Sequence, residues 1–268
     1  MYPHIHISYH MTQKTKESNR KAIIIGASSG IGREVTKLLI ADGWTVGIAA
    51  RRKENLESLR DMETTDDNGM KSGKIHISSI DVNSEESVSK LHDLIRSIGG
   101  VDLFFYSAGI GKQNIMLDKD TELSTVNTNC MGFCSMIGCA YRYMASHGGG
   151  HIASITSIAG TKGLGAAPAY SATKAFQTTY LEALSQQANL RKLNIRFTDI
   201  RPGFVATPLL GDSNHYPLLM PVEKVARIIV KAVYDKKEIK IVDWKWHIIT
   251  FFWKLIPSAI WKKMNICK

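Results

Sequence analysis

The chain has 268 residues, 44% of them hydrophobic, and 34 Lys and Arg against 24 Asp and Glu give it a formal net charge of +10. That length and apolar content allow a large core and fit a single α/β domain. The four cysteines fit no secreted disulfide framework and lack the paired short spacings of a zinc site. We therefore expect reduced thiols in a cytoplasmic protein.

The N-terminus is polar and contains His4, His6 and His10. No apolar run there is long enough for a signal peptide, so we expect residues 1–20 to be a flexible extension that binds no metal. Met11 is an alternative start of translation. We expect one main domain over residues 21–245 and a separate basic, aromatic segment over 246–268.

Short apolar runs typical of strands alternate with helical patterns along the main domain. Strands separated by helices imply a parallel sheet with helices on both faces. Seven such runs are present: AIII, TVGIAA, KIHISSI, VDLFFYSAG, HIASITS, NIRFTDI and EIKIVD. The sequence therefore predicts an α/β fold with seven strands.

The first of these runs leads into a glycine-rich turn. Gly26, Gly30 and Gly32 have the spacing Gly-x-x-x-Gly-x-Gly, and an amphipathic helix is predicted from about Ile31 to Ala41. Glycines let the backbone approach a pyrophosphate, and a helix N-terminus offers free N–H groups and the positive end of its dipole. Strand, turn and helix together predict a dinucleotide-binding site.

The end of the second run bears on which dinucleotide binds. An acidic residue there would bind a ribose 2′-hydroxyl and repel a 2′-phosphate, whereas arginine favours the phosphate. The chain has Arg51 and Arg52 there, and its first carboxylate is Glu54, inside the next predicted helix. We predict NADP(H), with Arg51 as the main contact. The alternative is that the arginines are a solvated helix start and NAD(H) binds.

Tyr170 and Lys174 are four residues apart in an Ala-rich segment after Pro168 that is predicted to be a helix. Positions i and i+4 share a helix face, so the phenol and the ammonium project into the same space. A nearby cation lowers the pKa of tyrosine toward the range for acid/base catalysis. Ser157 ends the fifth run, where its hydroxyl is able to hydrogen-bond a carbonyl oxygen.

These features resemble the short-chain dehydrogenase/reductase family in order and spacing. The resemblance covers residues 21–207, and its one departure is Tyr106-Ser107 where the family usually has two asparagines. It implies a Rossmann-like, doubly wound α/β fold with a mostly parallel, seven-stranded sheet. The motifs that carry it are GASSGIG at 26–32, Asp81-Val82, YSAG at 106–109, Asn129 ahead of Gly132, Ser157 with Tyr170-x-x-x-Lys174, and PGFVAT at 202–207.

The resemblance also implies the cofactor contacts. Asp81 and Val82 are expected at the adenine, and the 202–207 segment at the nicotinamide end, with the Thr207 hydroxyl near the carboxamide. The full expected set is Gly26, Ser28, Ser29, Gly30, Ile31, Gly32, Arg51, Arg52, Asp81, Val82, Ala108, Gly109, Tyr170, Lys174, Pro202, Gly203, Val205 and Thr207.

The mechanism implied by the family has four residues. NADPH delivers hydride to a carbonyl carbon while Tyr170 gives its proton to the developing alkoxide, and Ser157 polarises that oxygen. Lys174 lowers the pKa of Tyr170 and holds the nicotinamide ribose. Asn129 positions a water in a proton relay to the lysine.

Two neighbouring residues are alternatives for these roles, Asn127 and Ser154. We favour Asn129 over Asn127 because it has the family's spacing to Gly132 and to Ser157. Ser154 has the wrong spacing to the tyrosine, and alternation along a strand would turn it to the other face.

The region after Thr207 determines the substrate in this family and holds no motif. The loop LLGDSNHYPLLMP is mostly apolar, which fits an apolar, lipid-like substrate. Residues 223–268 carry +7 of the net charge and include WKWHIITFFWKLIPSAIW, which is interrupted by Lys254 and Pro257 and too short to span a membrane. We expect this segment to pack on the domain, at the substrate mouth or at an oligomer interface. Contact with a membrane surface is the alternative, and nucleic acid is not expected.

The sequence thus predicts an NADP(H)-dependent oxidoreductase that interconverts a ketone and a secondary alcohol. One alternative is a reductase of a 3-oxoacyl thioester or long-chain keto-amine in lipid synthesis. Another is a non-catalytic, NADP(H)-binding regulatory protein. Family members are commonly dimers or tetramers, so a homo-oligomer is expected.

Overall fold

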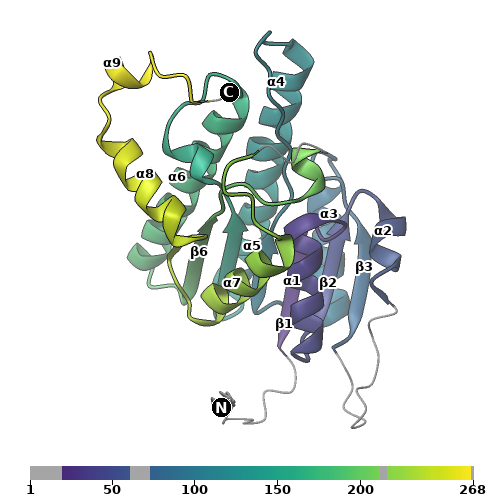
Figure 1. Ribbon diagram of the computed structural model, residues 1–268. Coiled ribbons are helices and arrows are strands. Elements are labelled where there is room, and N and C mark those ends of the chain that lie inside the picture. The colour runs from purple at the N-terminus through teal and green to yellow at the C-terminus, as the bar shows by residue number, and fades with distance from the viewer. Residues whose placement is uncertain (1–19, 61–72, 212–215, 267–268) are drawn as a thin grey trace, which may run out of the picture.

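The computed structural model describes residues 20–60, 73–211 and 216–266, so nearly all of the predicted N-terminal extension lies outside the described residues. Seven parallel strands form one sheet in the order β3-β2-β1-β4-β5-β6-β7 (Figure 1), which confirms the predicted fold. The strands are β1 (Lys21–Ile25), β2 (Thr45–Ala50), β3 (Ile75–Ser79), β4 (Leu103–Tyr106), β5 (Gly150–Ile155), β6 (Ile195–Arg201) and β7 (Ile239–Ile241).

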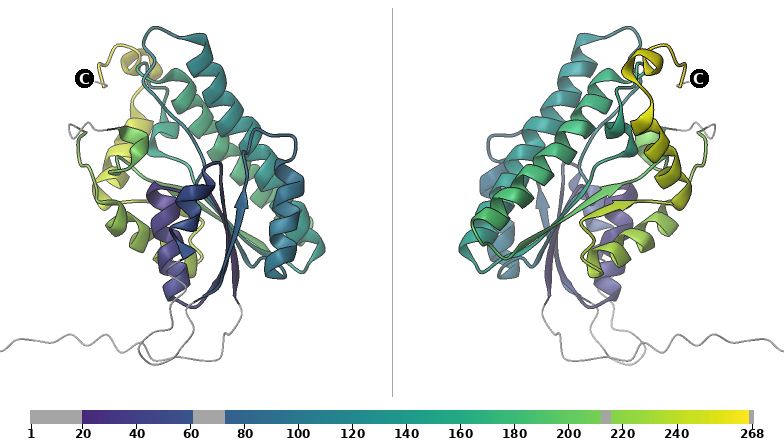
Figure 2. Two further views of the ribbon diagram at one scale, coloured as in Figure 1. Left: turned by 90° about the vertical axis from the view of Figure 1, so that its right-hand side faces the viewer. Right: turned by 90° about the vertical axis from the view of Figure 1, so that its left-hand side faces the viewer.

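Helices cover both faces of the sheet (Figure 2). On one face α1 (Gly30–Ala41) packs against α7 (Val222–Tyr234), and on the other α3 (Ser87–Ile98) packs against α5 (Phe133–Ser146), with α6 (Pro168–Leu190) beside them. The remaining helical segments are α2 (Lys53–Glu57), α4 (Lys119–Val126), the π-helix η2 (Asn127–Gly132), the 3₁₀ turns η3 (Ile158–Thr161) and η4 (Pro208–Leu210), α8 (Trp244–Leu255) and α9 (Ser258–Trp261).

The central strands β1 and β4 are mostly apolar, as is expected where helices bury both of their faces. Ile24 and Phe105 pack in the core beneath α1 and α7, whereas Ile23 and Phe104 pack in the core beneath α3 and α5. This alternation between two cores follows from the period of two along a strand.

Several strands end earlier than the apolar runs predicted, and two of them lead into the site. β4 stops at Tyr106 instead of continuing to residue 109, and β5 stops at Ile155 instead of 157. After β5 the chain turns into η3, where the Ser157 hydroxyl accepts a hydrogen bond from the Ala159 N–H at 3.0 Å. Both segments leave the sheet at its carboxyl edge, and this places them beside the ligand crevice.

The chain order creates that crevice between β1 and β4. From β1 the chain runs outward to β2 and β3, then crosses back to β4 on the other side of β1. The loops that follow these two strands diverge, so a groove opens at their carboxyl ends, where open α/β sheets bind ligands.

The C-terminal segment forms two helices beside this edge of the sheet. α8 packs against η3 and β7, and its Trp246 is buried in the core that contains α1 and α7. Within the described part of the chain, no helix is long and apolar enough to cross a membrane.

Candidate active site

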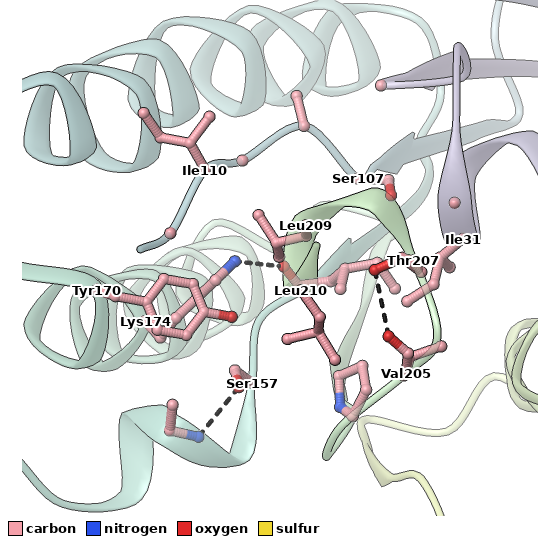
Figure 3. A pocket seen from close by; sticks show the side chains of 18 of the residues that line it. Ile31, Ser107, Ile110, Ser157, Tyr170, Lys174, Val205, Thr207, Leu209 and Leu210 are labelled. Atoms are coloured by element: carbon pink, nitrogen blue, oxygen red, sulfur yellow. Dashed lines mark hydrogen bonds between the residues drawn. The ribbon is translucent and has the colours of Figure 1, made fainter. Parts of the chain in front are cut away.

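A cavity of about 1000 Å³ lies at the carboxyl ends of the strands. It is lined by every predicted cofactor and catalytic residue except Gly32 and Asn129. Figure 3 shows Tyr170 and Lys174 side by side on α6, with Leu209 and Leu210 of η4 across the pocket. The cavity therefore joins motifs that extend from Gly26 to Thr207 in the chain.

The glycine turn connects β1 to α1 at one end of this cavity. Gly26 has φ +91°, and a Cβ there would lie 2.6 Å from the Ala108 backbone nitrogen. A Cβ on Gly32 would lie 2.3 Å from the Gly26 carbonyl oxygen. Gly32 thus lets the turn close but does not line the cavity. Only glycine fits at either position, so a backbone surface remains open to a ligand.

The N-terminus of α1 faces the cavity with unoccupied donors. Ser29 is the N-cap residue and makes no side-chain cap hydrogen bond. Gly30, the next residue, lies near Thr207, since a Cβ on it would be 3.2 Å from Thr207 Cγ2. The free N–H groups and the helix dipole suit an anion such as a pyrophosphate.

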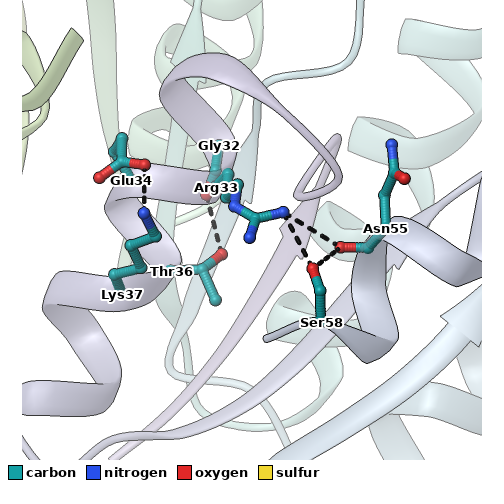
Figure 4. Close-up of polar contacts among 7 residues, drawn as sticks. All are labelled: Gly32, Arg33, Glu34, Thr36, Lys37, Asn55 and Ser58. Carbon is teal, nitrogen blue, oxygen red and sulfur yellow. Dashed lines mark hydrogen bonds and ion pairs between the residues drawn. The ribbon is translucent and has the colours of Figure 1, made fainter. Parts of the chain in front are cut away.

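Two arginines line the cavity where β2 ends, and a third, Arg33, supports the helix that follows them. Arg51 and Arg52 are exposed and line the cavity, and Arg52 Nη2 lies 3.5 Å from the Ser29 hydroxyl. Arg33 reaches from α1 to α2 (Figure 4), with Nη1 3.1 Å from Ser58 Oγ and 3.4 Å from the Asn55 carbonyl oxygen. Arg33 thereby fixes α2, the helix that begins directly after the two lining arginines.

Asp81 and Val82 line the cavity after β3. One Asp81 carboxylate oxygen accepts a hydrogen bond from the Asn83 N–H at 3.0 Å. Val82 packs closely against Gly132, where a Cβ would lie 2.7 Å from Val82 Cγ2. This contact holds the β3 loop next to η2.

Ser157, Tyr170 and Lys174 meet at the centre of the cavity. Ser157 and Lys174 are both buried, and all three line the cavity. Lys174 Nζ lies 5.7 Å from the centroid of the Tyr170 ring, which confirms that i and i+4 project together. The loop from β4 covers the ring, because a Cβ on Gly111 would lie 2.3 Å from Tyr170 Cδ2.

The pKa of Tyr170 departs from the expectation drawn from its spacing to Lys174. Burial raises the pKa of the phenol above its usual value of 10.0, and a hydrogen bond with Ser157 only partly offsets this. The physical reason is that a low-dielectric site disfavours the charged phenolate. The structure therefore holds Tyr170 as a protonated phenol, the form that donates a proton.

Lys174 is a buried cation with protein partners. Its Nζ donates to the Ile155 carbonyl oxygen at 3.1 Å and to Gln177 Oε1 at 2.9 Å. Burial lowers its pKa to about 8, while Asp199 acts in the opposite direction. Near neutral pH most of the Lys174 population therefore remains charged, although it titrates within reach of ordinary assay conditions.

Asn129 lies behind the cavity wall and not in it. In η2 it is fully buried, its Oδ1 accepts from the Ile110 N–H at 2.9 Å, and its Nδ2 donates to the Ile110 carbonyl at 2.7 Å. π-Helical turns are common at functional sites, where they displace one residue from the regular helix. Here the turn lets Asn129 hold the β4 loop.

Gln177 occupies the position between Asn129 and Lys174. It is fully buried, and its Nε2 donates to the Asn129 main-chain carbonyl at 2.8 Å. Its Oε1 accepts from Lys174 at 2.9 Å, so one side chain bridges the two groups. The sequence analysis missed Gln177, although its i+3 spacing from Lys174 was a usable signal.

Asn127 and Ser154, the alternatives to Asn129 and Ser157, do not face the cavity. Asn127 is exposed on the surface, and Ser154 is fully buried with a hydroxyl that has no hydrogen-bond partner among the described residues. Neither residue lines the cavity. The geometry thus brings Ser157, but not Ser154, next to Tyr170.

Tyr106 replaces the first asparagine expected at the end of the central strand. Its ring is buried edge-on against Phe133, with centroids 5.1 Å apart. Ser107, in place of the second asparagine, donates its backbone N–H to the Ile25 carbonyl oxygen at 2.8 Å. Aromatic packing and a main-chain hydrogen bond therefore hold this strand to its neighbours.

Aromatic side chains form a further part of the cavity wall, and the sequence analysis did not predict which residues these are. Phe204 and Tyr216 stack with centroids 4.6 Å apart, and Trp246 and Trp253 of α8 line the same region. Trp246 packs on Gly203, where a Cβ would lie 2.1 Å from its Nε1. The aromatic tail thus forms part of the site.

Cys130 and Cys134 are partly exposed free thiols and Cys139 is a buried one; Cys267 lies outside the described residues. Across residues 20–60, 73–211 and 216–266 there is no cluster of three metal-ligating side chains. The three N-terminal histidines considered above lie outside the described residues.

Comparison with known proteins agrees with this architecture. The family model described as short chain dehydrogenase matches residues 20–217. An uncharacterized oxidoreductase of Myxococcus xanthus is 29% identical over 91% of this chain and 95% of its own length. Carbonyl reductase family member 4 of Danio rerio is 34% identical over 71% of this chain and 78% of its own.

The fold also matches solved structures. A short-chain dehydrogenase from Sphingobium yanoikuyae in complex with NADPH superimposes with a TM-score of 0.75, covering 93% of this chain and 98% of that one at 16% identity. The chain belongs to the short-chain dehydrogenase family, and it is an oxidoreductase with a Rossmann-type site for a nicotinamide cofactor.

Proposed function

We propose that this enzyme is an NADP(H)-dependent oxidoreductase that interconverts a ketone and a secondary alcohol on an apolar, lipid-like substrate. The observation that carries the proposal is the convergence of Ser157, Tyr170 and Lys174 on the cavity that begins at the glycine turn. A hydroxyl, a protonated phenol and a cation suit proton transfer to a carbonyl oxygen.

The described residues fit a 2′-phosphorylated dinucleotide. The backbone at Gly26 is left open, the α1 N-terminus has free donors, and β2 ends at Arg51 and Arg52 with no carboxylate before Glu54. Arginine forms paired hydrogen bonds to phosphate, and an acidic residue at this point would repel it. These features support NADP(H) over NAD(H).

Each catalytic residue has a distinct task in the proposed reduction. The bound cofactor supplies the hydride. Tyr170 donates its phenolic proton to the carbonyl oxygen, and the Ser157 hydroxyl donates a hydrogen bond to the same oxygen, where negative charge develops. The Lys174 ammonium stabilises the phenolate that remains after proton transfer. Asn129 and Gln177 hold the lysine and the β4 loop in position.

The aromatic wall supports an apolar substrate. Beyond Tyr170 the cavity is bounded by Phe204, Tyr216, Trp246 and Trp253. Aromatic side chains favour apolar partners because contact removes apolar surface from water. This wall is equally compatible with a 3-oxoacyl thioester or a long-chain keto-amine, which are the closest alternative substrates. A purely regulatory NADP(H)-binding protein is disfavoured, because cofactor binding alone does not require the Ser157–Tyr170 pair.

The direct test is consumption of NADPH with a panel of steroids, long-chain ketones and acyl thioesters. The Tyr170→Phe variant is expected to lose a factor of about 10²–10⁴ in rate, as loss of a general acid does. It should still bind NADPH, measured by fluorescence titration. Tyr180→Phe is the matched control, since Tyr180 lies on the same helix outside the cavity. Retention of more than about a tenth of the rate by Tyr170→Phe would exclude the proton-donor role.

A further inference from the structure

The outer face of α8 and α9 is apolar and uncovered. Trp244 is 68% exposed, Phe251 57%, Phe252 59% and Leu255 63%. Contiguous apolar surface of this kind marks a site of protein or membrane interaction. The opposite face of α8 is buried, because Trp246 and Thr250 pack inward. The helix is therefore apolar on both sides, and only one side has a partner within the described chain.

The charged side chains on this face are basic from residue 244 onward. Lys245 and Lys254 on α8, and Lys262 and Lys263 directly after α9, are all exposed. From residue 244 to the end of the sequence there is no Asp or Glu. Lysines beside an aromatic helix face complement an anionic lipid surface, where the ammonium groups reach phosphates and the rings sit at headgroup depth.

A second apolar group lies next to the same cavity. Ile115, Met116 and Leu117 are 72%, 90% and 61% exposed. They lie one residue beyond Lys112 and Gln113, which line the cavity. On the other side, Trp253 and Ile266 of the C-terminal segment line it as well. Figures 1 and 2 place α4, which follows the 115–117 loop, and α9 at the same end of the molecule, past the carboxyl ends of the strands.

We propose that the α8–α9 face and the 115–117 loop bind an anionic lipid surface, so that the mouth of the cavity faces the bilayer. The inner face of α8 forms the wall of the cavity while its outer face lies among lipid headgroups. An apolar substrate then passes from the membrane along α8 into the site without crossing bulk water. Binding to lipid stands on the exposed residues alone, whereas substrate entry from the bilayer also rests on the proposed function.

A second copy of the chain is the competing occupant of this face. Two such faces brought together would juxtapose the lysines of both copies with no carboxylate from the same segments to neutralise them. Like charges in contact oppose association. The charge pattern therefore favours an anionic lipid over self-association.

The test is co-sedimentation of the full-length protein with vesicles of phosphatidylcholine alone or mixed with phosphatidylglycerol. The wild-type protein is expected to bind the mixed vesicles at least about tenfold more tightly, and raised salt should weaken that binding. Phe251→Ser/Phe252→Ser, and separately Lys254→Glu/Lys262→Glu/Lys263→Glu, should each reduce binding by about tenfold or more.

The matched control is Leu190→Ser, which removes an exposed apolar side chain at the C-terminal end of α6, the end away from the cavity, and should leave vesicle binding unchanged. Ile115→Ser/Met116→Ser tests the orientation and should weaken binding severalfold. If the loop variant binds as the wild type does, the mouth does not face the bilayer. Circular dichroism and the thermal midpoint establish that each variant is folded.

Several results would overturn the lipid proposal. One is that the wild-type protein shows no preference for the anionic vesicles. Another is that the α8 variants bind the vesicles as tightly as the wild type does. A third is that no vesicle binding is seen while light scattering shows a changed oligomeric mass in the α8 variants. Vesicle binding needs no turnover, and Tyr170→Phe should bind vesicles as the wild type does. Failure of the enzymatic proposal would therefore leave this measurement unaffected.

Discussion

At the scale of single residues, the position of Lys174 depends on a side chain that does not reach the cavity. Gln177 accepts from the ammonium and donates to the Asn129 carbonyl, and both contacts are fully buried. The pKa and the position of a buried cation depend strongly on its few hydrogen-bond partners, because water does not replace a partner that is lost. Gln177 is thus a positioning residue for Lys174.

We predict opposite shifts in the pH–rate profile for two Gln177 variants. Gln177→Glu places a carboxylate beside Lys174 and should raise its pKa from about 8, whereas Gln177→Leu removes an acceptor and should lower it. The alkaline limb of kcat should move up or down by roughly one pH unit. Gln187→Leu, an exposed change on the same helix, is the control. Shifts in the same direction would indicate a merely structural role.

Arg51 provides a second test at this scale. Arg51→Asp replaces a cation that favours a 2′-phosphate with a carboxylate that binds a 2′-hydroxyl. The ratio of kcat/KM for NADPH to that for NADH should fall at least roughly tenfold, the equivalent of one charged hydrogen bond. Lys53→Asp makes the same charge change two positions on, outside the cavity, and should have little effect. A ratio that Arg51→Asp leaves unchanged would defeat the NADP(H) assignment.

At the scale of elements, β5 and β6 are joined by a partly buried polar contact as well as by backbone pairing. His151 of β5 has its Nε2 2.8 Å from the Thr198 hydroxyl of β6. Burial, together with Lys236 and Arg196, lowers the pKa of His151 from 6.5 to about 4. The folded protein therefore holds this imidazole neutral at pH values where the unfolded chain protonates it.

The consequence is a loss of stability in acid. Between pH 6.5 and 4 the unfolded chain binds more protons at His151, so its contribution is complete above pH 6.5 and is lost as the pH falls toward 4. The loss amounts to roughly 3 kcal/mol. His151→Gln should show a flatter dependence of unfolding free energy on pH, measured by urea titration, while His247→Gln, at an exposed site, should follow the wild type. Parallel curves for wild type and His151→Gln would contradict the assignment.

At the scale of the whole molecule, the oligomeric state stays a prediction from the family resemblance. The monomer mass is 29.8 kDa, so light scattering after gel filtration should give two or four times that value. A monomer at micromolar concentration would contradict the expectation. Phe251→Ser/Phe252→Ser should leave the mass unchanged, because we assign that face to lipid.

Much of the fold and of the site follows from local patterns. Gly26 and Gly32 are required by the backbone geometry of one turn, and Tyr170 and Lys174 share a face because one helix has a fixed period. The contacts of Gln177 with Asn129 and of Trp246 with Gly203 join residues more than 40 positions apart. No local period predicts such contacts, and the position of Asn129 also depends on a π-helical turn.

The sequence by itself determined the parallel sheet and the dinucleotide turn, and it predicted that Tyr170 and Lys174 share a helix face, since each depends on spacing within one or two neighbouring elements. Only the tertiary structure decided that burial raises the pKa of Tyr170, because that depends on what surrounds the phenol. It also decided which face of α8 is buried. Because α8 carries aromatic residues on both its inner and its outer face, the apolar pattern does not identify the inner face. The packing of Trp246 on Gly203 does.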